Sequence, residues 1–336
     1  KRVTLDVTAY EQTSKGQVIT VKVPNSTGFP NLLINVGESK NWGYEGDLKL
    51  QILNHTKLKW ELGIRYSYND NKVIDLFPGV NSFQLADGFS YANTNVIKGE
   101  RFPLLKTDGY KYAPDGSGRR LVNASSGYPL RDASLLNRGG VLPRHIAGLT
   151  SKLALGDVAF AFTFEYRGGN VFFSDLGRQM TFTGAGGWTS NRDPHIFPNS
   201  AILGGADGKT VTDNNVQVRE PEYGLWVDNY RLIAENFVAP GWFVKLRDVS
   251  LSLNLPEKWI SSARLSGASI SIFGRNLLTF KDKLNTFTDP EFSRVGDGGL
   301  LNSLLNGTGL GNGVGINSTG QTPPVRQYGF SINLGF

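Results

Sequence analysis

Hydrophobic and polar residues alternate with a period of two along several segments of the chain. The clearest segment is the last, where Tyr328, Phe330, Ile332, Leu334 and Phe336 alternate with small or polar residues. A period of two places each set of residues on one face of a β-strand. The pattern therefore predicts an amphipathic strand at this end of the chain.

The same alternation predicts about eight amphipathic strands in all. They span residues 2–12, 42–53, 57–69, 146–155, 157–167, 243–255, 264–279 and 327–336. The polar faces carry Glu61, Arg65, Glu165 and Arg167. Charged side chains are costly inside a packed core but ordinary in a water-filled lumen. The pattern favours an all-β, antiparallel transmembrane barrel over a soluble sandwich.

In such a barrel the apolar face of each strand contacts lipid. The residues expected to face lipid are Leu62, Ile64, Phe160, Phe162, Phe164, Leu251, Leu253, Phe330, Ile332 and Leu334. Aromatic residues near strand ends form girdles at the membrane interfaces. The girdle candidates are Trp60, Tyr66, Tyr68, Tyr166 and Trp259.

The connections between the predicted strands alternate between short and long. Short turns lie at 54–56, 155–157 and 256–263, and long loops span about 13–39, 70–144, 168–241 and 281–325. Outer-membrane barrels combine short periplasmic turns with long extracellular loops, whereas long structureless loops are uncommon in soluble domains. A break in the alternation just before Asp248 predicts a β-bulge there, or a strand that leaves the membrane at the outer rim.

Composition narrows the possibilities further. The 336 residues contain no cysteine, 39% hydrophobic and 19% charged residues, and a net charge of +6. The basic residues are scattered, which gives no footprint for nucleic acid. No stretch approaches the roughly 20 apolar residues of a membrane helix, but barrel strands leave only a weak hydropathy signal.

No segment predicts a catalytic, metal or cofactor site, so we expect a protein that is not an enzyme. The histidines, His55, His145 and His195, have no useful ligand spacing. Asp289 and Glu291 flank a proline, which favours a turn over the paired carboxylates of a glycosidase.

The sequence offers better candidates for a binding site than for a catalytic site. The loop 168–241 carries Trp188, Arg192, Tyr223 and Trp226, which suit contact with a substrate or with a lid partner. The alternative is that these aromatic residues pack the loop on itself. Lys245 and Arg247 near the outer rim are expected either to meet phosphates of lipopolysaccharide or to remain solvated.

Several motifs together resemble the SusC-like TonB-dependent transporters, the SusC/RagA family. The segments that carry the resemblance are Asn35–Gly46, Arg178–Ser200, Trp242–Pro256, Gly274–Thr279, Thr288–Glu291 and Thr322–Leu334. They span nearly the whole chain, and they are specific in combination rather than singly. Phe336, a terminal aromatic residue on an amphipathic strand, resembles the signal read by the bacterial outer-membrane assembly machinery.

This resemblance implies an integral protein of the bacterial outer membrane. The family forms a 22-stranded barrel plugged by an N-terminal domain, so residues 1–336 would be the C-terminal part, about the last eight strands, without the plug. It imports oligosaccharides or peptides without a cofactor, using TonB–ExbB–ExbD, which would act through the absent N-terminal region. A SusD-like surface lipoprotein caps it, and outer-membrane lipid and lipopolysaccharide surround it.

Two other classes of function stay open at this point. The barrel could be a structural scaffold in an outer-membrane assembly or secretion complex, or the chain could be a soluble β-sandwich adhesin. Because the sequence begins directly with a strand pattern, we also expect it to be a fragment of a longer protein.

Overall fold

The computed structural model describes residues 2–22, 25–29, 31–204, 209–260, 265–286, 288–291, 315–317 and 324–335. The strands are β1 (Val3–Lys22), β2 (Asn31–Asn54), β3 (Leu58–Asp75), β4 (Ser82–Gly88), β5 (Ala92–Ile97), β6 (Leu104–Tyr110), β7 (Arg120–Leu121), β8 (Arg131–Gly140), β9 (His145–Leu155), β10 (Val158–Gly168), β11 (Val171–Ser174), β12 (Ser200–Gly204), β13 (Thr210–Asp213), β14 (Val238–Pro240), β15 (Phe243–Asn254), β16 (Gly267–Lys281), β17 (Ile316–Asn317) and β18 (Gln327–Gly335). The helices are α1 (Asp175–Thr183), α2 (Glu257–Ile260), the π-helix η3 (Pro221–Val227) and the 3₁₀ turns η1 (Asn25–Thr27), η2 (Gly187–Ser190), η4 (Tyr230–Leu232) and η5 (Ala234–Phe237).

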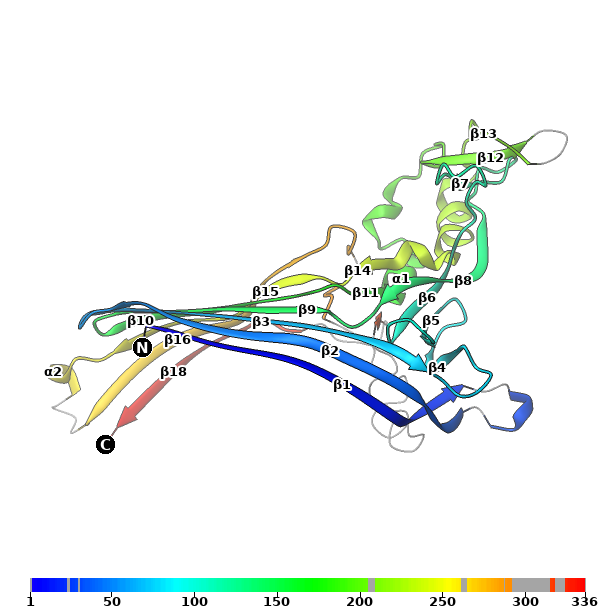
Figure 1. Ribbon diagram of the computed structural model, residues 1–336. Helices are drawn as coiled ribbons and strands as arrows, with labels where there is room; N and C mark the ends of the chain where they lie inside the picture. The colour runs from blue at the N-terminus through cyan, green and yellow to red at the C-terminus, as the bar shows by residue number, and fades with distance from the viewer. Residues whose placement is uncertain are drawn as a thin grey trace.

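Eight long strands form one continuous antiparallel wall. Their order across the sheet is β18-β16-β15-β10-β9-β3-β2-β1, and β4, β5, β6 and β8 continue the sheet beyond β1. Figure 1 shows the two chain ends and the short turns at one end of this wall, while the long connections gather at the other end. The eight predicted strands and the antiparallel all-β fold are therefore confirmed.

The strand register places residues of one kind in rows across the wall. One row contains only apolar residues, Leu48, Ile64, Leu149, Phe164, Leu246 and Leu278. The neighbouring row lies on the opposite face and contains Asp47, Arg65, Gly148, Glu165, Lys245 and Thr279. We call these surfaces the apolar face and the polar face of the wall.

The apolar face is exposed rather than packed against other elements. Phe160, Leu251 and Phe330 are 40%, 44% and 73% exposed, and Phe162 is half-buried. None of these four residues belongs to the buried clusters of the described residues. This exposure fits a surface covered by lipid, and lipid contact by the ten predicted residues stays a prediction.

A β-bulge interrupts β15 where the sequence pattern loses its phase. Thr163 pairs with Asp248 and Phe164 pairs with Leu246, so Arg247 is the extra residue. The inserted residue lets Lys245, before the bulge, and Asp248, after it, both pair with residues of the polar face. The bulge predicted near Asp248 is confirmed.

The segments expected to be long loops contain regular structure. β1 continues to Lys22 and β2 begins at Asn31, so most of 13–39 is a hairpin extension rather than a loop. The segment 70–144 holds β4 to β8, and 168–241 holds β11 to β14 with α1 and η2 to η5. Most of 281–325 lies outside the described residues.

These connecting segments build their own hydrophobic clusters. Phe173 and Phe237 are fully buried in one cluster with Leu105, and Tyr110, Leu225 and Ile233 form another. Among the described residues, no helix has the length and apolar character needed to cross a membrane. The buried core of the described chain thus lies in the connections, beyond the end of the wall.

Candidate functional site

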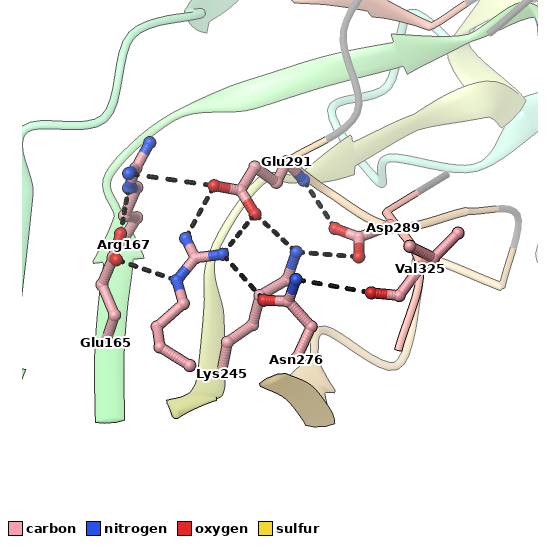
Figure 2. Close-up of polar contacts among 8 residues, drawn as sticks. Glu165, Arg167, Lys245, Asn276, Asp289, Glu291 and Val325 are labelled. Carbon is pink, nitrogen blue, oxygen red and sulfur yellow. Dashed lines mark hydrogen bonds and ion pairs between the residues drawn. The ribbon is translucent and has the colours of Figure 1, made fainter. Parts of the chain in front are cut away.

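The most densely charged site lies where the bulge of β15 meets the segment after β16. Lys245 and Arg247 come from β15, Glu165 and Arg167 come from β10, and Asp289 and Glu291 follow β16. Figure 2 shows Glu291 at the centre of this ion network, between the side chains of the two strands and Asp289. We call these six residues the ion network.

Glu291 holds the two cations of β15 together. Its Oε2 accepts from Lys245 Nζ at 2.6 Å, while Arg247 donates to both of its oxygens, at 2.7 Å and 2.6 Å. Lys245 also lies 2.8 Å from Asp289 Oδ2, and Arg247 Nε donates to Glu165 Oε2 at 2.9 Å. The bidentate arginine contact fixes both distance and orientation.

Charge balance explains how the ion network tolerates burial. Lys245 is 0% exposed, and an unpaired ammonium in that position would be very costly. Three cations face three carboxylates, so the cluster is neutral as a whole. Burial alone raises the pKa of Glu291, but the hydrogen bonds from Arg247 and Lys245 outweigh it and hold that pKa at about 2.

The ion network corrects one prediction and extends another. Neither Lys245 nor Arg247 is a solvated rim charge or available for lipopolysaccharide, because both are paired with carboxylates. Asp289 and Glu291 do form a turn, in which the Glu291 N–H donates to Asp289 Oδ1 at 2.9 Å. Their carboxylates in addition fasten this turn to the wall.

Segments that carry the family resemblance therefore meet at one place. Asn276, on β16, accepts from Arg247 and donates to the carbonyl of Val325, both at 3.5 Å. The backbone of Asn276 has φ 52°, in the left-handed region that asparagine tolerates better than most residues. The phase break at Arg247 was the sequence signal of this site, but the partners of the buried charges could not be read from spacing.

A second candidate site is a pocket among the connecting segments. Its volume is about 250 Å³, and it lies between the C-terminal end of α1 and the π-helix η3. The lining includes Arg192, Glu222, Tyr223 and Trp226. Three of the four residues predicted for substrate or lid contact are thus brought together, and Glu222 is an addition that the sequence analysis missed.

Local structure positions the aromatic side chains of this loop pocket. Gly184 ends α1 with φ 71°, which turns the chain towards η2. Trp188 then donates its indole N–H to Thr181 Oγ1 at 3.0 Å, and Trp226 donates to the carbonyl of Asn191 at 3.1 Å. Both indoles are part of the packing of the loop, as the alternative interpretation supposed.

Other residues of the loop pocket remain available for a ligand. Tyr223 is 61% exposed, and Arg192 and Glu222 are also exposed. Within the described part of the chain, none of these three side chains has a hydrogen bond or ion pair. The loop pocket therefore offers an aromatic ring, a cation and a carboxylate to a bound molecule.

The polar face of the wall is hollowed as well. Two adjoining cavities of about 400 Å³ and 520 Å³ share Asp47, Arg65 and Thr150 in their linings. Arg65 Nε donates to Asp47 Oδ2 at 2.7 Å, which satisfies two charges of this face with each other. Such a surface suits water and polar solutes rather than a hydrophobic core.

The histidines do not converge on one another. His145 Nδ1 forms a hydrogen bond of 2.8 Å with the Tyr66 hydroxyl, His195 bonds the carbonyl of Asp193, and His55 lies in the β2–β3 turn. No group of metal-ligating side chains occurs among the described residues. Phe336 lies outside the described residues.

The wall and its connections together define a portion of an outer-membrane β-barrel. In sequence, the chain is 24% identical over 332 residues to TonB-dependent receptor P26 of Formosa agariphila, covering 90% of the chain and 30% of that receptor. It is also 24% identical over 327 residues to TonB-dependent receptor P3 of the same organism, covering 94% of the chain and 30% of that receptor. No family model matches the chain.

Solved structures agree with this fold. The RagAB peptide importer in its closed-closed state matches with a TM-score of 0.66 and 19% identity, over 100% of the chain and 34% of the matched chain. The importer in its open-open state matches with a TM-score of 0.63 and 19% identity, over 100% and 33%. The comparisons support the resemblance to SusC-like TonB-dependent transporters and an outer-membrane location.

The chain spans about a third of the length of the relatives and structures that it matches. These relatives carry the names of receptors and importers rather than enzymes. What the matched proteins bind or transport is a property of those proteins, so it enters below only as a proposal.

Proposed function

We propose that this chain is part of a nutrient importer of the bacterial outer membrane. The wall would form one side of the barrel, with its apolar face in lipid and its polar face towards the transport path. The observation that carries this proposal is the opposition of the two faces: an exposed apolar row lies directly behind a hollowed, ion-paired polar row.

The connections would act at the extracellular end. In this proposal residues 1–336 form the C-terminal part of the barrel, and the loop pocket contacts a substrate or a SusD-like lid lipoprotein. Oligosaccharides and peptides both fit a pocket with an exposed ring and unpaired charges. The similarity to a peptide importer supports import in general. TonB–ExbB–ExbD would supply energy through a region outside this chain.

The test is uptake by a strain that lacks the full-length gene, complemented with wild-type or variant protein. Deletion should abolish growth on at least one oligosaccharide or peptide mixture as the sole nutrient. The variant Tyr223→Ala should weaken uptake by roughly 2- to 12-fold at low substrate concentration, as expected when about 0.5–1.5 kcal/mol of aromatic contact is lost.

Phe77→Ala is the matched control, because Phe77 is an exposed aromatic residue of a connection outside the loop pocket. It should leave uptake unchanged. Unaltered growth of the deletion strain on every candidate nutrient would overturn the importer proposal. Copurification of assembly or secretion proteins with the barrel would then favour the scaffold alternative.

A further inference from the structure

The apolar face of the wall changes character towards the end that carries the long connections. Beyond the apolar row of Ile64, the register brings Tyr44, Tyr68 and His145 into one row across β2, β3 and β9. Tyr44 and Tyr68 stack with ring centroids 5.1 Å apart, and Tyr66 bonds His145. An aromatic row at this position is typical of the level of the lipid headgroups.

Charged side chains follow directly after this aromatic row on the same face. Asp70 lies two residues beyond Tyr68 and accepts a hydrogen bond of 3.2 Å from the Tyr68 hydroxyl. Lys72 lies two residues further, in unbroken register, and is exposed. From Tyr68 to Lys72 the strand rises roughly 13 Å, at about 3.3 Å per residue.

Two arginines from separate turns of the connecting segment 70–144 converge on Asp70. Arg101 Nε lies 2.6 Å from Asp70 Oδ1, and Arg144 Nε lies 3.4 Å from Asp70 Oδ2. Burial lowers the pKa of Arg101, Asp70 opposes that shift, and the nearby charge of Arg144 adds to it. One carboxylate therefore serves two guanidinium groups that repel each other.

The positive charge at this place is not balanced within the described residues. Asp70 is the one carboxylate bonded to Arg101 and Arg144, and the terminal amino groups of Arg144 have no hydrogen bond in the described chain. The Lys72 ammonium likewise has none there. The Arg144 side chain is 38% exposed, so an anion can reach it.

We propose that Arg144 and Lys72 form a site for the phosphate group of an anionic lipid in the outer leaflet, with Arg101 adding positive charge behind them, because its terminal nitrogens already donate to the carbonyls of Gly169 and Leu142. Arginine binds phosphate with paired N–H donors, and lysine adds a point charge. A lipid is favoured over a soluble anion because the site continues the exposed apolar face, and the aromatic row separates hydrocarbon from headgroup. This inference depends on the membrane location in the proposed function, and not on the substrate.

This phosphate site takes the place of the lipopolysaccharide contact that was expected of Lys245 and Arg247 and that the ion network excludes. Lys245 and Arg247 are neutralised on the polar face, whereas Lys72 has no ion pair among the described residues and Arg144 shares Asp70 with Arg101. Alternation on β3 assigns Lys72 to that face, but the positions of Arg101 and Arg144 depend on folding of the connections.

The experiment is native mass spectrometry of the full-length protein, purified in detergent and titrated with phosphorylated lipid A. Each exposed basic residue near an anionic surface contributes about 1 kcal/mol, which is about fivefold in affinity. The double variant Arg144→Ala/Lys72→Ala should therefore retain the lipid roughly 25-fold more weakly. The charge-retaining variant Arg144→Lys/Lys72→Arg should keep most of the binding.

The matched control is Lys57→Ala/Lys59→Ala, which removes two exposed lysines at the opposite end of β3 and should leave lipid binding unchanged. Equal binding of dephosphorylated lipid A, or equal weakening by the control, would overturn the proposal. Saturation by inorganic phosphate at the same concentration would show a site for soluble anions and overturn the lipid assignment. Uptake measured in the same variants separates this site from the importer proposal, because lipid binding can be lost while import persists.

Discussion

The wall and the connecting segments use hydrophobic residues in opposite ways. In the wall, Leu251 and Phe330 are exposed, and the charged residues Glu165 and Lys245 lie on the opposite face in paired form. In the connections, Phe173 and Leu225 are fully buried, and most charged residues face outward. One chain therefore contains an inverted surface and an ordinary globular core.

This difference shows that alternation alone does not define the inside of a protein. The same period of two would serve a soluble sandwich, in which apolar rows pack together. Here the charged rows decide the matter, because they form ion pairs around water-accessible hollows. The exposed apolar face opposite a hollowed, charged face distinguishes the wall from the connections, where paired charges such as Asp108 with Arg131 are buried as well.

The largest effect should follow from breaking the ion network. Glu291→Gln leaves the buried Lys245 and Arg247 without their shared partner, which costs about 3–5 kcal/mol when one member of a buried pair is removed. Denaturant unfolding in detergent, followed by tryptophan fluorescence, measures this change.

Asp248→Asn is the matched control, because Asp248 pairs with Arg275 across the same wall at an exposed position. Its cost should be about 0–1 kcal/mol. Equal destabilisation by the two variants would show that burial adds nothing to the free-energy cost of removing a carboxylate from an ion pair.

A comparable loss is expected in the connections from Phe173→Ala. Removing a fully buried phenylalanine costs about 3–5 kcal/mol, and the loss should open the cluster around Phe237. Limited proteolysis of the folded protein should then cut the connections faster. Phe160→Ala, on the exposed apolar face, should leave this cleavage rate unchanged, and equal rates for the two variants would contradict independent packing of the connections.

A charge on the apolar face should cost somewhat less. Leu251→Lys is expected to destabilise the protein by about 2–4 kcal/mol in lipid vesicles, with the upper value at the bilayer centre. Ser250→Lys, one residue away on the polar face, should be nearly neutral. Refolding into vesicles measures both costs. Similar costs would show that the two faces contact the same surroundings, rather than lipid on one side and water on the other.

The smallest effect concerns pH. The pKa of Glu291 is about 2 in the folded protein and about 4.5 without its partners. Because the folded pKa is lowered, its stabilisation is complete above about pH 4.5 and is lost as pH falls towards 2, by up to about 3 kcal/mol. Glu291→Gln should remove this part of the pH dependence, and an unchanged profile in that variant would contradict the assignment.

The sequence predicted the wall well because each strand is specified locally. Alternation around Ile64 and Phe162 defines the two faces, and the phase break at Arg247 locates the bulge. The connections were predicted poorly, since their short strands and buried clusters depend on contacts between distant segments. Leu105 and Ile316, for example, belong to one cluster although no pattern links them.

The candidate sites were likewise predicted in part, since local patterns were readable and contacts between distant segments were not. The sequence predicted Arg192, Tyr223 and Trp226 as candidates for substrate or lid contact, and the structure places them in the lining of one pocket. It did not predict that Asp289 and Glu291 neutralise Lys245, or that Arg101 and Arg144 meet Asp70. Long-range charge pairing has no local signature in a single sequence.

The bulge at Arg247 has a consequence for tolerance of insertions and deletions. Removing this single residue would restore uninterrupted pairing with β10 and would leave both sides of the strand in phase, because Leu246 would still pair with Phe164 and Asp248 with Thr163. Adding one residue in the regular part of the strand, between Ser250 and Leu251, would instead exchange the two faces on one side of the insertion, so that Leu251 and Leu253 turn towards water or the residues before them change sides. Deletion of Arg247 should therefore weaken the ion network but preserve both faces, whereas a single added residue in the regular strand should harm the protein far more.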